Sequence, residues 1–113
     1  MVSLKDTCPV IHSEQELGKA LQTDRVVALF YASWCPFCVK VLPAFQKSVP
    51  GEGRNLIVVQ DDQETMAETY AVKVYPTLLC FEKGAVTRRL DGVLGIGISD
   101  KDLKAFVDSC PRA

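Results

Sequence analysis

The sequence predicts an α/β domain in which a mixed central sheet of about five strands is flanked by four helices. Three observations predict this class. Apolar runs of strand length, rich in β-branched residues, alternate with segments whose apolar residues recur at helical spacing. The last two strand-like segments are separated by only a short turn, which indicates an antiparallel hairpin. No linker, internal repeat or low-complexity tract interrupts the chain, so residues 1–113 are expected to form one domain.

The first half of the chain predicts a helix, a strand and a second helix after an N-terminal strand. Ser13-Glu-Gln-Glu16 is a capping-box pattern, which indicates that a helix begins there. Residues 26–32 are continuously apolar and predict a central strand covered on both faces. Pro36 suits the first position of the next helix, and Pro43 is expected to kink it. One buried stripe is expected on this second helix: Cys38, Leu42, Phe45 and Val49.

The second half predicts a strand, a short helix, a hairpin and a final helix. Residues 56–60 form another buried strand, and one of the two aspartates that follow it is expected to cap the short helix. Residues 77–81 and 85–90 are expected to pair through a turn that contains Lys-Gly. Ser99 can cap the final helix. The apolar stripe of that helix is expected to be Leu103, Phe106, Val107 and Cys110.

Composition and charge argue against several classes of partner. The formal net charge is -1 and basic residues are mixed with acidic ones along the chain, so we expect no nucleic-acid or anionic-membrane partner. No apolar run is long enough to span a bilayer, and the N-terminus has no apolar core of the kind found in signal peptides. These features predict a cytoplasmic protein.

The five cysteines point to a redox dithiol rather than to a disulfide framework. Their number is odd and their spacing irregular, but Cys35 and Cys38 lie two residues apart in SWCPFCV. Such a pair indicates redox catalysis, half of a metal site, or two core thiols. A zinc site needs four ligands, and the remaining candidates contain no second close pair: Cys8, His12, Cys80 and Cys110. We therefore favour a redox pair, with Cys80 and Cys110 as packing residues and a Cys8–Cys110 bond as a minor alternative.

The motif WCPFC between a predicted strand and a helix resembles the WCxxC site of the thioredoxin superfamily. The resemblance continues through Pro43, Tyr75-Pro76-Thr77, Lys83-Gly84 and Gly92, and so covers nearly the whole chain. The N-terminal strand and helix favour thioredoxins proper over glutaredoxins. The resemblance implies a thioredoxin fold with a cis peptide before Pro76. It also implies a protein-disulfide oxidoreductase that serves electron transport and cell redox homeostasis.

The two thiols are expected to be unequal. Cys35 lies at a helix N-terminus, where unpaired N–H groups and the helix dipole favour a thiolate, so we expect an exposed nucleophile. Cys38 is one turn further on and shielded, so it is expected to resolve the mixed disulfide. By resemblance, a substrate rim surrounds the dithiol: Trp34, Pro36, Phe37, Tyr75, Pro76 and Gly92. The resemblance also implies no bound cofactor beyond the redox-active disulfide Cys35–Cys38, protein disulfides as substrates, a reductase of the thioredoxin-reductase type, and a monomer.

Several positions depart from the family pattern. Pro36-Phe37 stands where thioredoxins usually carry Gly-Pro. Leu29 replaces the buried acid six residues before the first cysteine, and Ile57 replaces a lysine on the third strand. Tyr75 is bulkier than the usual residue before the cis-proline. Losing the acid removes a base for Cys38, so we expect its attack on the mixed disulfide to be slow.

Three alternatives remain open from the sequence alone. CPFC also resembles a glutaredoxin site, and residues 97–100 at a helix start loosely resemble a glutathione-carboxylate site, which favours a glutathione-dependent oxidoreductase. A non-enzymatic module could instead use the cysteines to hold a metal or an iron–sulfur cluster. The third alternative is a rigid subunit of a larger assembly, in which the redox chemistry is incidental.

Overall fold

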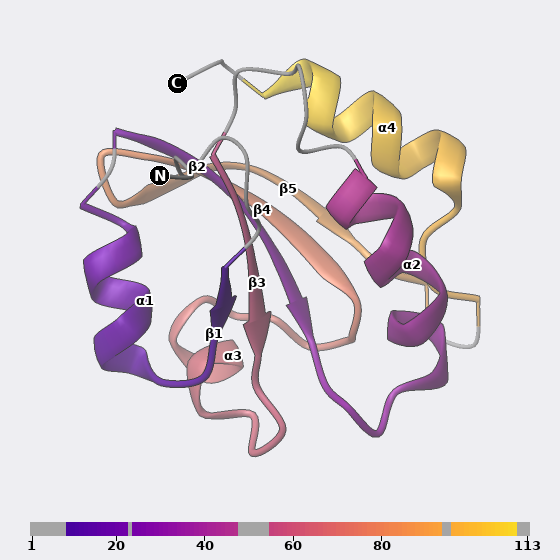
Figure 1. The fold of residues 1–113 in the computed structure, drawn as a ribbon, viewed down its shortest axis with the longest axis horizontal. Helices are drawn as coiled ribbons and strands as arrows, with labels where there is room; N and C mark the ends of the chain where they lie inside the picture. The colour runs from indigo at the N-terminus through magenta and orange to yellow at the C-terminus, as the bar shows by residue number, and fades with distance from the viewer. Residues whose placement is uncertain (1–8, 23, 48–54, 94–95, 111–113) are drawn as a thin grey trace.

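The structure, a computed structural model, describes residues 9–22, 24–47, 55–93 and 96–110. Within these residues, helices and strands follow one another in the predicted order (Figure 1). The elements are β1 (Val10–Ile11), α1 (Glu14–Ala20), β2 (Arg25–Tyr31), α2 (Pro36–Lys47), β3 (Leu56–Gln60), α3 (Thr65–Thr69), β4 (Thr77–Glu82), β5 (Ala85–Asp91) and α4 (Asp100–Ser109). The prediction of a mixed sheet with four helices is therefore confirmed for the described part of the chain.

The five-stranded sheet has the order β1-β3-β2-β4-β5. β3 is parallel to both β1 and β2, whereas β4 is antiparallel to β2 and to β5. β2 lies at the centre, and every residue of it except Arg25 is buried, as its continuous apolar run predicts. One cluster of buried side chains packs between the sheet and α2 and α4, and a second cluster packs between the opposite face and α1 and α3 (Figure 1).

Short polar side chains fix where the helices begin. The Ser13 hydroxyl accepts a hydrogen bond from the Glu16 N–H at 3.1 Å, and the Ser99 hydroxyl accepts one from the Asp102 N–H at 3.1 Å. Both caps were predicted and both are confirmed. At α3 the carboxylate of Asp61, the first of the two aspartates, accepts from two backbone N–H groups at the start of the helix. Each cap satisfies N–H groups that have no partner inside the helix.

The buried face of α2 differs by one position from the predicted stripe. Cys38, Val41 and Phe45 are buried, whereas Leu42 is only partly buried. Val41 and Leu42 lie on opposite sides of the line that joins Cys38 to Phe45, and the core covers the side that carries Val41. Helical spacing alone does not choose between these two sides, so the prediction missed Val41. Val49 lies outside the described residues, and Pro43 lies inside the helix, as expected.

The β4–β5 hairpin closes through two residues that both have positive φ. Lys83 has φ 53 and Gly84 has φ 82, which matches the twist of a tight antiparallel hairpin. β5 forms an exposed edge of the sheet. The Arg89 guanidinium on this edge donates to the carbonyl oxygens of Tyr70 and Ala71 just after α3. Arg89 therefore links β5 to the segment that follows α3.

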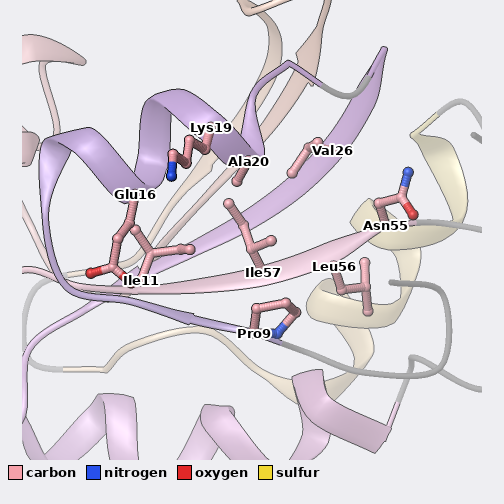
Figure 2. Close-up of a pocket in the computed structure, with 9 residues that line it drawn as sticks. All are labelled: Pro9, Ile11, Glu16, Lys19, Ala20, Val26, Asn55, Leu56 and Ile57. Carbon is pink, nitrogen blue, oxygen red and sulfur yellow. The ribbon is translucent and has the colours of Figure 1, made fainter. Parts of the chain in front are cut away.

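A pocket of about 430 Å³ lies between α1, β1 and β3 (Figure 2). Its lining is mostly apolar, with Glu16 and Lys19 as its charged members. Among the described residues that line it there is no cysteine and none of the residues predicted for the dithiol site. The pocket is therefore separate from the described dithiol Cys35 and Cys38. None of the helices that the structure describes is long and apolar enough to cross a membrane.

Candidate active site

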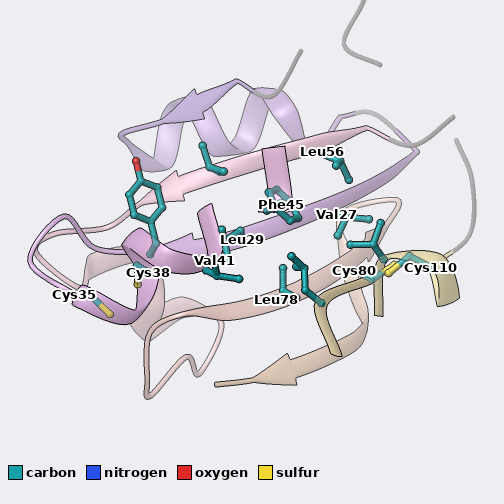
Figure 3. Packing of buried hydrophobic residues seen from close by; sticks show 14 of the residues in the cluster. Val27, Leu29, Cys35, Cys38, Val41, Phe45, Leu56, Leu78, Cys80 and Cys110 are labelled. Carbon is teal, nitrogen blue, oxygen red and sulfur yellow. The ribbon is translucent and has the colours of Figure 1, made fainter. Parts of the chain in front are cut away.

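The dithiol lies where the central strand passes into α2. β2 ends at Tyr31, and the Cys35 N–H donates to the Ala32 carbonyl at 3.1 Å, which turns the chain toward the helix. α2 begins at Pro36, so Cys35 directly precedes its first turn and Cys38 lies within that turn. The Cys38 N–H donates to the Cys35 carbonyl at 3.2 Å. Figure 3 shows both side chains at one end of the buried cluster.

Cys35 is more enclosed than the sequence predicted. Its exposed fraction is 4%, against 0% for Cys38. The expectation of an openly exposed nucleophile is therefore wrong in degree, although the predicted order of the two thiols holds. The cause is the segment before Pro76, because the Cys35 Sγ lies 3.5 Å from the Tyr75 carbonyl oxygen and donates to it. Little of the Cys35 side chain is therefore open to a substrate sulfur in this conformation.

The Cys38 thiol holds its proton strongly. Burial, first, and a hydrogen bond with the Cys35 side chain raise the pKa of the Cys38 thiol from 9.0 to about 12, while a backbone hydrogen bond with Ala32 opposes the shift. Burial disfavours a charged sulfur because the surroundings cannot solvate it as water does. At neutral pH Cys38 is therefore protonated, and it has to lose a proton before it can act as a nucleophile.

Tyr75 directs its hydroxyl to Asp61, while its ring stays beside Trp34 of the predicted substrate rim. Its hydroxyl donates to the Asp61 carboxylate at 2.9 Å and approaches the Asp61 carbonyl oxygen at 3.2 Å. Burial, followed by the hydrogen bond to Asp61 and its charge, raises the pKa of Tyr75. The ring also packs edge-on against Trp34, with 5.7 Å between ring centroids. The hydroxyl and the Trp34 contact thus hold in place the backbone carbonyl that faces Cys35.

Asp62 holds the segment that leads into the dithiol. Its carboxylate accepts from the Ser33 N–H at 2.7 Å and from the Ser33 hydroxyl at 2.8 Å, and its carbonyl accepts from the Trp34 indole N–H at 3.1 Å. The Ser33 N–H, more than the Gln60 and Ser33 side chains, lowers the pKa of Asp62. The sequence suggested only a helix cap here. The contact of Asp62 with Ser33 depends on the parallel pairing of Tyr31 with Gln60, which brings residues 61–62 beside 32–33. Local spacing in the sequence does not indicate this pairing.

The structure brings the other predicted rim residues to the same place. Trp34 is 58% exposed and Pro36 is exposed, whereas Phe37 is partly buried and Pro76 is buried. The peptide before Pro76 is cis, as the resemblance implied. The Gly92 N–H donates to the Pro76 carbonyl oxygen at 2.9 Å, and a Cβ at Gly92 would collide with that oxygen. Only glycine fits this approach, and the substrate-binding assignment itself stays a prediction.

Two positions where the family carries charged groups are apolar and buried. Leu29 is 0% exposed and belongs to the same cluster as the dithiol, so the side chain there can neither donate nor accept a proton. Ile57 is 3% exposed and packs in the cluster on the opposite face of the sheet. Both positions that depart from the family pattern are therefore apolar core positions in the structure. The interior around Cys38 is apolar on the side of β2.

A metal site finds no support among the described residues. Residues 9–22, 24–47, 55–93 and 96–110 contain no group of three His, Cys, Asp or Glu side chains that could hold a metal ion. Cys8 lies outside this part of the chain, and the suggested Cys8–Cys110 bond lies outside it too. In the segment 97–100, the Ser99 hydroxyl is engaged as the cap of α4.

An α/β sheet that carries a CxxC pair at a helix start, beside a cis-proline, defines a thiol–disulfide oxidoreductase domain. The family model described as Thioredoxin matches residues 9–109. The chain belongs to the thioredoxin family.

Individual relatives agree with this assignment. The chain is 29% identical to a thioredoxin of Neurospora crassa over 115 residues, which covers 96% of this chain and 91% of that protein. It is 32% identical over 81 residues to protein disulfide-isomerase A5 of Mus musculus, covering 66% of this chain but only 16% of that protein. The structure of a mutant thioredoxin from Halobacterium salinarum superposes with a TM-score of 0.81 at 23% identity, covering 100% of this chain and 98% of that one. The last likeness concerns the fold alone.

Proposed function

We propose that the protein reduces disulfides in other proteins by dithiol–disulfide exchange through Cys35 and Cys38. The observation that carries the proposal is the placement of the pair at the start of α2, with Cys35 just before the first turn, 4% exposed, and Cys38 within that turn, 0% exposed. The helix start supplies N–H groups and a dipole that favour a thiolate on Cys35. The apolar surroundings keep Cys38 protonated at neutral pH, before it attacks the mixed disulfide.

The exchange takes place in two steps. The Cys35 thiolate attacks one sulfur of the substrate disulfide, which forms a mixed disulfide and releases the other substrate sulfur as a thiolate. Cys38 then loses its proton and attacks the Cys35 sulfur, which releases the second substrate thiolate and leaves a Cys35–Cys38 disulfide. Two electrons pass from the protein dithiol to the substrate. The electrons are stored in the two sulfurs, so the cycle uses no other bound cofactor.

Asp61, Asp62 and Tyr75 keep the geometry for these steps. Asp62 fixes Ser33 and Trp34 just before the nucleophile, and Tyr75 presents its carbonyl to the Cys35 sulfur from the opposite side. This carbonyl becomes available to accept from the backbone of an extended substrate segment once Cys35 has reacted. The exposed ring of Trp34 would cover the apolar part of that segment.

A separate reductase is needed to return the Cys35–Cys38 disulfide to the dithiol. We assign this task to an enzyme of the thioredoxin-reductase type and place the protein in the cytoplasm as a monomer that carries electrons between that enzyme and its substrates. The odd number and irregular spacing of the cysteines, which suit a reducing compartment, support this placement. The glutathione-dependent alternative differs in its electron donor and can be separated from it directly.

Turnover with two electron donors tests the proposal. Reduction of insulin disulfides is followed with NADPH and thioredoxin reductase, and in parallel with NADPH, glutathione and glutathione reductase. We expect turnover with the first system, and its loss in Cys35→Ser. Turnover with the glutathione system alone would mean that glutathione, and not a reductase of the thioredoxin-reductase type, is the electron donor. Failure with both systems and with dithiothreitol would overturn the reductase assignment itself.

A further inference from the structure

Two cysteines outside the active site lie in the same layer of the core. Cys80, in β4, is 1% exposed, and Cys110, the residue that ends α4, is 2% exposed. Both belong to the cluster between the sheet and the helices α2 and α4, and both are in the reduced, thiol form in the structure. They come from segments thirty residues apart in the sequence, so no local pattern links them.

Both side chains lie at the end of the cluster away from the dithiol (Figure 3). Alternation along β4 places Cys80 on the same face as Leu78, toward α2 and α4, whereas Leu79 faces the other cluster. Figure 3 shows the sulfur ends of Cys80 and Cys110 directed at each other, with Cys35 and Cys38 at the opposite end of the cluster. The core layer thus carries a pair of thiols at each of its ends.

The backbone at Cys110 is able to accommodate a bond between the two sulfurs. A disulfide requires particular separations of the two Cα and the two Cβ atoms, so one partner usually has to adjust. Cys110 has left the helix, with φ -74 and ψ 140, and its N–H ties it to the last turn through the Phe106 and Val107 carbonyls. Rotation about ψ and about the side chain of Cys110 therefore changes the position of its sulfur without changing the helical φ and ψ of the residues before it.

We propose that Cys80 and Cys110 form a second redox pair, which a small-molecule disulfide such as glutathione disulfide oxidises to an intramolecular disulfide. The Cys110 thiolate attacks glutathione disulfide and releases one glutathione, and the Cys80 thiolate then attacks the Cys110 sulfur and releases the second. The protein loses two hydrogen atoms, and glutathione disulfide becomes two molecules of glutathione. The bond ties the C-terminal end of α4 to β4.

Burial makes this oxidation slow and dependent on local opening. Neither sulfur is accessible in the closed structure, but the last turn of a helix frays at a lower free energy than the core strands open. Opening of the last turn of α4 exposes Cys110 first, and reclosing brings its mixed disulfide onto Cys80. The rate should therefore rise in low concentrations of urea that leave the fold intact.

The experiment uses the full-length chain with serine at positions 8, 35 and 38, so that Cys80 and Cys110 are the remaining thiols. The protein is incubated with glutathione disulfide while circular dichroism confirms the native spectrum. We expect the intact mass to fall by the mass of two hydrogen atoms. After denaturation neither cysteine should react with a maleimide, and a non-reduced digest should contain a peptide that joins the two segments. In the matched controls Cys110→Ser should leave Cys80 as a thiol, and Cys80→Ser should stop at a glutathione adduct on Cys110.

Two results would overturn the inference. Either both thiols stay reduced after long incubation of the native protein, or glutathione adducts and intermolecular dimers accumulate instead of the internal bond. The same peptide map of the oxidised wild-type chain provides the second measurement, so a variant that fails to fold does not decide the question. The variant lacks the catalytic pair, and the wild-type map reports only the peptide that joins Cys80 to Cys110, so neither result bears on the proposed reductase function.

Discussion

The slow step of the proposed cycle should be the attack of Cys38, and raising the pH should accelerate it steeply. Burial, together with the hydrogen bond to the Cys35 side chain, raises the pKa of this thiol from 9.0 to about 12. At neutral pH only a very small fraction of the molecules would therefore carry the Cys38 thiolate. The neighbouring position Leu29 has no carboxylate that could accept the proton.

The size of the effect follows from the thiolate fraction. Well below the pKa, that fraction rises about tenfold for each pH unit, so the resolution rate should rise about a hundredfold between about pH 7 and about pH 9. A thiol with the ordinary pKa of 9.0 would begin to level off within this range. In the mixed disulfide Cys35 no longer bears a thiol, but burial, the first cause of the shift, persists.

Release of a coloured leaving group measures this step alone. A mixed disulfide between Cys35 and thionitrobenzoate is prepared, the pH is raised in a stopped-flow instrument, and the released thionitrobenzoate is followed by absorbance. Cys38→Ser is the control and should show only slow background release. A rate that is flat or levels off below about pH 9 would mean that Cys38 ionises readily despite its burial, which contradicts the raised pKa.

Three substitutions test the surrounding structure. Leu29→Asp should speed thionitrobenzoate release at neutral pH, because the new carboxylate can act as a base. It should also lower the free energy of unfolding by about 2–5 kcal/mol, because a core side chain is replaced by a buried acid. An unchanged release rate would count against the need for a base. Tyr75→Phe removes the hydrogen bond to Asp61 and should cost about 1.5–3 kcal/mol in urea unfolding, so unaltered stability would show that this bond contributes nothing. Gly92→Ala should force the backbone away from the Pro76 carbonyl, cost about 1–3 kcal/mol and reduce insulin turnover; wild-type stability and turnover would contradict the tight fit.

The order of the elements was predictable because each segment of the sequence agrees with its place in the fold. The apolar run at 26–32 could be covered on both faces only at the centre of a sheet, and β2 lies there. Ser13 and Ser99 marked helix starts through a local hydrogen bond that sequence spacing alone encodes. The dithiol was recognisable for the same reason, since its spacing, helix start and flanking strand are all local features.

Features that depend on contacts between distant segments could not be predicted in this way. Asp62 reaches Ser33 only because β2 and β3 are paired in one register. The hydrogen bond from the Tyr75 hydroxyl to the Asp61 carboxylate joins residues fourteen positions apart. The enclosure of Cys35 likewise arises from a segment forty residues further along the chain. Long-range packing decides these contacts, and no periodicity in the sequence reports it.

Trapping the mixed disulfide tests most directly whether Cys35 is the attacking sulfur and Cys38 the resolving one. Cys38→Ser and Cys35→Ser are each incubated with a protein disulfide substrate, and covalent adducts are identified by non-reducing electrophoresis and mass spectrometry. We expect a stable adduct through Cys35 in the first variant and none in the second. An adduct through Cys38 in the Cys35→Ser protein, or no adduct in either variant, would show that the two sulfurs do not have these roles.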